Sequence, residues 1–292
     1  MNQQILERLG CTVFYVSLSQ ITRQSLDSGI LVNATRLRTG LELSMFNRIS
    51  FTVAGYPDIR RTDSKDIQQE IESCYDKYGM DETVIICRSN KMANKYNEFI
   101  RNRILYREEA LSCSDKLLVV KNNYFWLPEN ENTEFIANGD FVILRKIRRI
   151  HEMHGFNFAD CTVDFPDYNM EFEVKLLLES IRAEGPGISA DQSRELYNAV
   201  SLDYSHIANK RKRYEKLLED PYYNALQTKM GYAMTCHKAQ GGQWKAVFVD
   251  FSFFSQDSDN PETFRWLYTA ITRATERLYL VNFKDMYFDN ED

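Results

Sequence analysis

The polar segment "TCHKAQGGQ" (residues 235–243) and the isolated Arg273 carry the clearest chemical potential in this sequence. A threonine hydroxyl and backbone N–H groups at a helix start can hold a phosphate without a charged side chain, and paired glycines let a backbone approach a ligand closely. Arg273 follows the apolar helical pattern "TFRWLYTAI" and has short neighbours, so we expect its guanidinium to point across a cleft. In that position it can neutralise charge on a transferring phosphoryl group. The two segments together predict a site for a phosphate-bearing ligand.

Both features also have a plain structural interpretation. The segment 235–243 can be a polar loop with a glycine turn, and Arg273 can pair with Glu276 or with a carbonyl at the helix end. Taken singly, neither feature decides between a ligand site and a structural role.

The elements that must position these residues follow an alternating pattern at both ends of the chain. Residues 11–18 read as a strand, 27–41 as an amphipathic helix, 83–88 as a buried strand and 89–105 as a helix with Ser89 as its cap. Such alternation predicts a parallel sheet with crossover helices.

The middle of the chain has a different texture. Between residues 113 and 223, short runs rich in β-branched and aromatic residues are separated by turn-forming residues, and two helical segments follow. Beyond this region, "LQTKMGYAMT" reads as a strand ending at Thr235, and strand and helix alternate again to the C-terminus. We therefore predict an α/β domain formed by residues 1–112 and 224–292, interrupted by a small antiparallel β unit over 113–223.

Composition limits the class of protein. The net charge is −6, yet basic residues gather at 144–154 and 209–216; solvated surface explains each run, and together they leave a polyanionic partner open. The six scattered cysteines predict reduced thiols rather than a zinc site or a disulfide framework. Without a long apolar run or a signal sequence, we expect a cytoplasmic protein with no membrane partner.

Three motifs, in order along the chain, resemble superfamily 1 helicases. "YAMTCHKAQGGQW" resembles their motif V, "LYTAITRA" their motif VI, and "LSQITRQSLDSGILVNATRLR" the motif IV region of the RecD-like branch, which includes the alpha subunit of exodeoxyribonuclease V. "VKNNY" and "FIANGD" resemble the start of the SH3-like barrel of that branch. The resemblance implies an α/β fold: a RecA-like, P-loop NTPase-type second motor domain with an inserted small SH3-like β-barrel.

The resemblance also implies roles for ATP-facing residues. Arg23 matches the motif IV arginine that reaches the γ-phosphate, and Arg273 matches the motif VI arginine finger. Gly241 and Gln243 are the expected ATP-binding residues of motif V, with Gln243 near the ribose, where the family often has glutamate. An amide can donate and accept hydrogen bonds there.

A second group is implied to contact single-stranded DNA. Thr235 and His237 match motif V positions that touch the strand, and Arg88 and Asn90 fall near positions used for its backbone phosphates. For Lys238 two interpretations stay open, a further strand contact and a solvated surface position.

The parts that hold ATP and Mg²⁺ in such motors are missing. The chain contains no Gly-Lys pair, so it has no Walker A motif, and Asp81-Glu82 precedes a strand instead of ending one. We expect the C-terminal half of a helicase acting in DNA repair or recombination, with ATP and Mg²⁺ held mainly by the first motor domain. Its expected partners are that domain, single-stranded DNA and other exonuclease subunits.

Two other functions stay open. A degenerate, stand-alone nucleic-acid-binding or accessory protein would use the β insert and the basic runs, although it would gain little from γ-phosphate-sensing arginines. Nuclease activity would have to belong to a partner subunit, because no cluster of Asp, Glu and Lys has a metal-dependent nuclease pattern.

Overall fold

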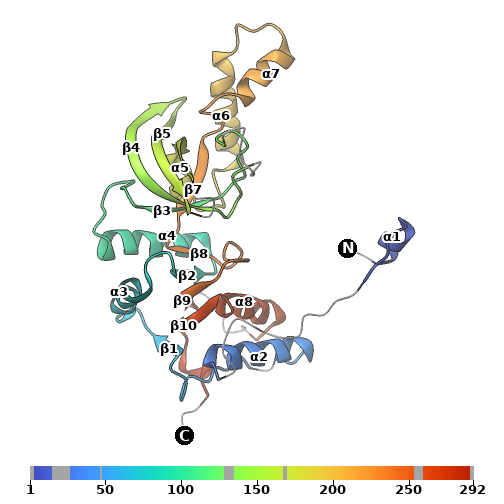
Figure 1. The fold of residues 1–292 in the computed structure, drawn as a ribbon, viewed down its shortest axis with the longest axis vertical. Helices are drawn as coiled ribbons and strands as arrows, with labels where there is room; N and C mark the ends of the chain where they lie inside the picture. The colour runs from blue at the N-terminus through green and yellow to red at the C-terminus, as the bar shows by residue number, and fades with distance from the viewer. Residues whose placement is uncertain are drawn as a thin grey trace.

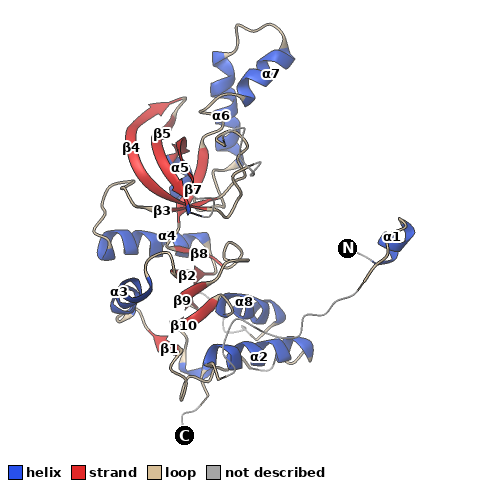
Figure 2. Cartoon of the chain, viewed as in Figure 1, coloured by secondary structure: helices blue, strands red, loops and turns tan. Residues whose placement is uncertain are grey.

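A computed structural model describes residues 3–14, 27–46, 48–127, 135–166, 170–252 and 259–289. A parallel sheet covered by helices forms one part of the molecule and a closed β-barrel the other, with two further helices at the far end of the barrel (Figure 1; Figure 2). The predicted mixed α/β architecture with a β insert is confirmed. Among the described residues, no helix combines the length and apolarity needed to cross a membrane.

The sheet has five strands in the order β1-β10-β9-β2-β8, and every neighbouring pair is parallel. Its strands are β1 (Ile59–Thr62), β2 (Thr83–Cys87), β8 (Ala233–Thr235), β9 (Trp244–Asp250) and β10 (Ala274–Val281). β2 was predicted from the apolar run at 83–88, and its five consecutive buried residues confirm a strand covered on both faces.

Side chains alternate between the two faces of the sheet, and each face is covered by its own helices. Val84 and Ile86 share a hydrophobic cluster with residues of α2 and α8, whereas Ile85 and Cys87 share another with residues of α3 and α4. Ser89 caps α4 by accepting a hydrogen bond from the backbone N–H of Met92 at 3.2 Å, as predicted. The helices are α2 (Gly29–Glu42), α3 (Ile67–Tyr78), α4 (Asn90–Phe99), its π-helical continuation (Ile100–Ile104), α8 (Pro261–Ile271) and a 3-10 turn (Asp285–Tyr287).

The insert is a closed barrel in the order β3-β4-β5-β6-β7. Four of its pairings are antiparallel, but β6 and β7 are parallel, which the sequence did not indicate. The chain between β6 and β7 holds three helices, and this long excursion allows the parallel pairing. The elements are β3 (Lys116–Val119), β4 (Phe141–Met153), β5 (Phe156–Phe165), β6 (Met170–Leu177), α5 (Leu178–Arg182), α6 (Ala190–Asp203), α7 (Lys210–Leu218) and β7 (Leu226–Met230).

The return from barrel to sheet lies later than the sequence suggested. The stretch 226–235, predicted as one strand, is two: β7 closes the barrel and β8 joins the sheet. Between them, Gly231 sits so close to Phe141 that a Cβ atom would come within 3.1 Å of its ring. The described barrel strands therefore continue to Met230, beyond residue 223.

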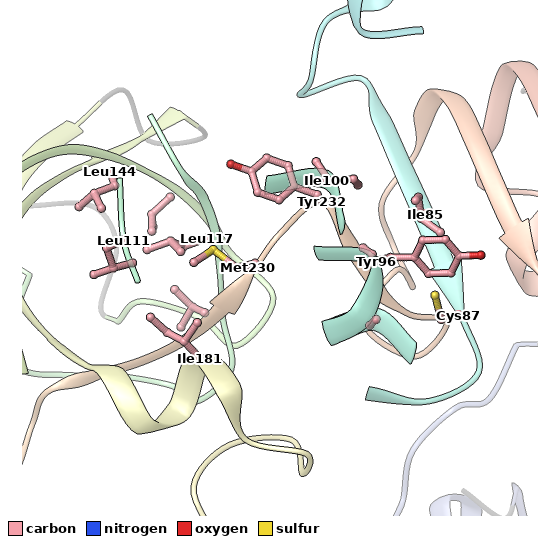
Figure 3. Close-up of a cluster of buried hydrophobic side chains, with 14 of the residues drawn as sticks. Ile85, Cys87, Tyr96, Ile100, Leu111, Leu117, Leu144, Ile181, Met230 and Tyr232 are labelled. Atoms are coloured by element: carbon pink, nitrogen blue, oxygen red, sulfur yellow. The ribbon is translucent and has the colours of Figure 1, made fainter. Parts of the chain in front are cut away.

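One hydrophobic cluster runs through both parts of the molecule. Figure 3 shows Ile85 and Tyr96 from the sheet side and Leu117 and Leu144 from the barrel, with Tyr232 between the two groups. Because the apolar core is shared, the barrel packs against the sheet directly instead of hanging from a flexible linker.

A buried polar cluster fixes the two points at which the chain crosses between sheet and barrel. Asp115 has 0% exposure and accepts hydrogen bonds from Arg101, Arg107, the backbone N–H of Ser112 and the Tyr232 hydroxyl. Arg101, Arg107 and Asp115 belong to the outgoing connection, and Tyr232 belongs to the return. The Asp115 carboxylate therefore holds together the two segments that connect the sheet and the barrel.

The N-terminal strand prediction is only partly testable. Residues 11–14 have no regular structure, and residues 15–18 lie outside the described residues. A short helix, α1 (Gln3–Arg8), precedes them.

Candidate functional site

The segment 235–243 is a compact loop of successive turns between β8 and β9. The Thr235 carbonyl accepts hydrogen bonds from the backbone N–H groups of Lys238 (2.9 Å) and Ala239 (3.1 Å), and Gly242 N–H donates to the Ala239 carbonyl (3.2 Å). Ala239 is fully buried and anchors the loop. The prediction that β8 ends at Thr235 is confirmed, but no regular helix follows it, so the expected helix start is wrong.

Arg273 is held against this loop. Its Nη1 donates to the Gly242 carbonyl at 3.0 Å, its Nε to the Thr269 carbonyl at 2.9 Å, and its Nη2 to the Thr272 hydroxyl at 3.2 Å. The expectation that the guanidinium projects across a cleft is therefore wrong for this conformation. Its helix-end carbonyl contact is the structural alternative considered from sequence, and its contact with Gly242 joins the two predicted motifs.

Backbone contacts strengthen the same junction. Trp244 N–H donates to the Arg273 carbonyl at 2.9 Å, and the Thr275 hydroxyl donates to the Trp244 carbonyl at 3.2 Å. The Trp244 ring lies against Gly242, where an added Cβ would be 2.4 Å from a ring atom. Only glycine leaves room for the tryptophan here.

Gly242→Ala is therefore expected to destabilise the fold by about 1–3 kcal/mol, because the methyl group must displace a buried indole. Gly185→Ala is the matched control, since the nearest atom to its Cβ is 3.5 Å away, an ordinary contact. Urea unfolding of the two variants measures the difference; equal midpoints would contradict the packing argument.

The sheet separates the predicted ATP-facing residues from most of the predicted DNA-facing ones. Trp244 and Ala274 pair at the amino ends of β9 and β10, so Gly241, Gln243 and Arg273 gather at that edge. Thr235 and Cys87 pair at the carboxyl ends of β8 and β2.

Arg88 and Asn90 follow directly after β2 at its carboxyl end. His237 is exposed on the loop that connects the two edges. The structure thus brings the predicted residues together as two groups joined by residues 235–243. Arg23 lies outside the described residues.

Arg88 and Asn90 sit where a helix begins. Asn90 is the first residue of α4, and the half-exposed Arg88 side chain contacts Glu262 in the first turn of α8 at 3.4 Å. A contact this long and exposed contributes little free energy, so a phosphate can compete with Glu262 for the guanidinium.

The pKa of the Cys236 thiol reflects the burial of this part of the loop. Burial raises this pKa to about 12, against which the nearby Arg273 charge acts. Its Sγ lies 3.6 Å from the Trp266 carbonyl.

Alkylation at pH 8 is expected to modify the exposed Cys11 and Cys113 well before Cys236. At that pH a thiol with such a pKa is only about one part in ten thousand thiolate, the reactive form. Mass spectrometry of iodoacetamide-treated protein measures the order. Cys236 labelling as fast as Cys113 in the folded chain would contradict a buried loop, and labelling in urea is the control for accessibility.

In each of the two basic runs, some of the cations pair with nearby carboxylates. Residues 144–154 fall mainly on β4, where Arg145 pairs with Asp164 and Arg148 with Glu173. The run at 209–216 overlaps α7, where acidic neighbours one turn away pair with two of its cations. These ion pairs favour the solvated-surface interpretation of both runs.

Comparison with known families supports the motif assignments at the C-terminal end. Residues 230–281 match the UvrD-like helicase C-terminal domain. This part of the chain is therefore similar to the C-terminal domain of UvrD-like helicases. The matched segment contains the loop 235–243, Arg273 and the strands on either side of them.

Longer proteins resemble a larger part of the chain. It is 22% identical over 233 residues to "Uncharacterized protein R530" of Acanthamoeba polyphaga mimivirus, a match covering 67% of this chain and 47% of that protein. Among solved structures, the Bacteroides Pif1 helicase in complex with ADP-AlF3 and ssDNA has a TM-score of 0.44 at 11% identity, covering 94% of this chain and 54% of that one. Pif1 helicase from Candida albicans has a TM-score of 0.36 at 12% identity, covering 93% and 57%. This chain thus spans about half the length of the proteins it matches.

Proposed function

We propose that the chain is the C-terminal half of an ATP-dependent DNA helicase or translocase of the RecD-like type. In this proposal the parallel sheet is the second, RecA-like motor domain and the barrel is its SH3-like insert. The observation that carries it is the hydrogen bond from Arg273 to the Gly242 carbonyl, which joins the two helicase motifs into one unit. A change at the arginine is thereby transmitted to the loop that carries Thr235 and His237.

The residues at the amino ends of β9 and β10 fit a nucleotide. Gly241 has φ +86° and no heavy atom within 4 Å of where its Cβ would lie, so the backbone there is open to a ligand. Gln243 is exposed two residues later. ATP and Mg²⁺ would be held mainly by the first motor domain, and the magnesium-bound triphosphate would supply the scissile phosphate bond.

The residues of this chain would orient the nucleotide and neutralise charge on its phosphates. Arg273 and Arg23 stabilise charge on the γ-phosphate, and Gln243 orients the ribose through its amide. At the opposite edge of the sheet, Arg88, Asn90 and Thr235 hold backbone phosphates of single-stranded DNA. Movement of the Arg273–Gly242 unit between nucleotide states would tighten and loosen that grip, giving stepwise motion along the strand.

The purified 292-residue chain alone is expected to hydrolyse no significant ATP and to bind single-stranded DNA weakly, because it supplies one side of the nucleotide cleft. Phosphate release with and without DNA measures the first point, and fluorescence anisotropy of a labelled oligonucleotide the second. Strong ATP turnover by this chain alone would contradict the proposal.

One observation favours a second candidate, a degenerate nucleic-acid-binding or accessory module. Arg273 already satisfies backbone carbonyls at Thr269 and Gly242, a structural role that such a module would keep. Upstream coding sequence separates the candidates, since an in-frame Walker A motif belongs only to the motor.

A further inference from the structure

The helices α6 and α7, here called the α6–α7 unit (residues 190–218), are attached to the barrel by a small apolar cluster of their own. Figure 1 shows them at the far end of the barrel, beyond β4 and β5. The buried members of this cluster are separate from the core shared by sheet and barrel: Phe156, Phe158, Leu177, Leu196, Val200, Leu217 and Ala225. Elements held by few buried contacts open locally at a lower free energy than the main core. The polar contacts between the α6–α7 unit and the barrel therefore matter for its docking.

The tip of the β4–β5 hairpin presents two histidines to this unit. The chain reverses between the strands at His154 and Gly155, whose φ angles of +55° and +77° are those of a tight two-residue turn. The side chains of His151 and His154 are nearly buried. Both rings contact the ring of Tyr222, in the segment between α7 and β7, with centroids 5.8 Å and 5.3 Å from it.

Tyr222 connects the hairpin to the helices. Its hydroxyl lies 3.2 Å from His151 Nε2, within hydrogen-bond distance. Its backbone N–H donates to one oxygen of the Asp220 carboxylate at 2.7 Å, and the other oxygen accepts from the hydroxyl of Tyr204, directly after α6, at 2.8 Å. A continuous series of hydrogen bonds thus runs from His151 through Tyr222 and Asp220 to the end of α6.

More cations than anions surround His151. Asp160 on β5 lies 3.7 Å from its Nδ1, but that carboxylate already pairs with the Lys175 ammonium on β6. The ammonium also lies 4.3 Å from the centroid of the Tyr222 ring, and Arg149 on β4 adds a second positive charge. Burial and the charge of Lys175 lower the pKa of His151 below its ordinary value, against the smaller effect of Asp160. A proton on His151 is therefore unfavourable while Tyr222 stays in place.

The surroundings of His154 have the opposite sign. Its Nε2 lies 3.4 Å from a carboxylate oxygen of Asp203, the last residue of α6. Within the described part of the chain, neither this nitrogen nor His151 Nδ1 has a hydrogen-bond partner. A proton on His154 would attract the Asp203 carboxylate and hold α6 against the hairpin. Of the two rings, only His151 favours release of the helices when it is protonated.

We propose that His151 is a pH-sensitive switch for the α6–α7 unit: the neutral imidazole keeps the unit docked on the barrel, and its protonation loosens it. A histidine whose pKa is lower in the docked form stabilises that form above its ordinary pKa of about 6.5, and this stabilisation is lost as the pH falls further. Loosening would also release the basic run at 209–216, which α7 carries. The inference concerns the barrel and does not rest on the proposed helicase function.

Hydrogen–deuterium exchange of the whole chain, read by mass spectrometry, measures the docking. After correction for intrinsic exchange rates, protection of peptides from α6 and α7 is expected to fall about threefold or more between about pH 7.5 and about pH 5.5. Protection of β9 in the sheet should stay constant over the same range. An equal fall in β9 would show loss of stability throughout the chain and would overturn the inference.

Histidine variants assign the effect to one ring. His151→Gln keeps a neutral polar side chain and should remove the pH dependence of protection. His206→Gln is the matched control and should retain it, because His206 is exposed beyond α6, with its ring against the Asp203 carbonyl. His154→Gln removes the opposing charge and should make the loss at low pH larger. A pH dependence that persists in His151→Gln, or that disappears in His154→Gln, overturns the inference.

Lys175→Met tests the electrostatic cause and does not depend on the folding of the histidine variants. Without the ammonium group, Asp160 is left to pair with a protonated His151, so acidification should no longer loosen α6 and α7. A fall in protection equal to that of the wild type would contradict the role of Lys175 and overturn the inference. ATP hydrolysis by the reconstituted motor tests the proposed function separately.

Discussion

Arg273→Ala is expected to lower DNA-stimulated ATP hydrolysis about a thousandfold when this chain is combined with its first motor domain. An arginine that neutralises charge on the transferring phosphoryl group contributes an effect of that order, and alanine removes all of its donors. Phosphate release at saturating ATP and DNA measures the loss. Arg265→Ala, an exposed arginine on α8, is the matched control and should retain activity.

The structural contacts of Arg273 require a second variant. Because its guanidinium also holds the Gly242 and Thr269 carbonyls, alanine is expected to loosen the loop as well. Arg273→Lys keeps the charge and one donor group for a carbonyl but loses the planar fork. If Arg273→Lys restores loop burial, measured by Cys236 alkylation, but not hydrolysis, the arginine acts on phosphate. Hydrolysis that recovers in step with loop burial would assign it a structural role.

Asp115→Ala is expected to destabilise the chain by about 3–5 kcal/mol, the usual cost of removing one partner from a buried ion pair. The carboxylate is fully buried, and its arginine partners are nearly so: the side chain of Arg101 is 9% exposed and that of Arg107 is 18% exposed. Alanine leaves both guanidinium groups and the Tyr232 hydroxyl without this acceptor. The stability loss is read from the midpoint of urea unfolding.

An exposed ion pair provides the control for Asp115. Asp285 contacts Arg61 at 2.5 Å, but the two side chains are 94% and 45% exposed, so Asp285→Ala should cost under about 1 kcal/mol. Asp115 holds together the two segments that connect the barrel and the sheet. Asp115→Ala should therefore unfold both parts in one transition, at a lower urea concentration than the wild type. Two separate transitions in the wild type, or equal midpoints for the two variants, would contradict a shared junction.

The sheet was largely predictable, because the hydrophobic pattern of a segment indicates whether that segment is buried. β2 is five consecutive buried residues and β9 is nearly as apolar, so both strands stand out in the sequence. β1 was not predicted, because "IRRT" is short and half of it is exposed at the sheet edge. A barrel was expected from the family resemblance, but the parallel pairing of β6 and β7 that closes it was missed, since that pairing depends on segments separated by three helices.

The segments that form the candidate site were predicted from the sequence, but the contacts between them were not. Thr235 ends its strand as expected, because an apolar run gives way there to polar residues. The partner of Arg273 could not be found from sequence, since the Gly242 carbonyl reaches it through the register of β9 and β10. The contact between Asn138 and Lys238 was also not predictable, because tertiary packing alone brings the turn before β4 to Lys238.

ATP turnover by the two halves mixed in trans tests the central claim most directly. The first motor domain, this chain and their mixture are each assayed for phosphate release with and without single-stranded DNA. We expect turnover only in the mixture, rising on addition of DNA. A mixture that binds DNA yet hydrolyses no ATP would contradict the motor assignment and favour the degenerate binding module.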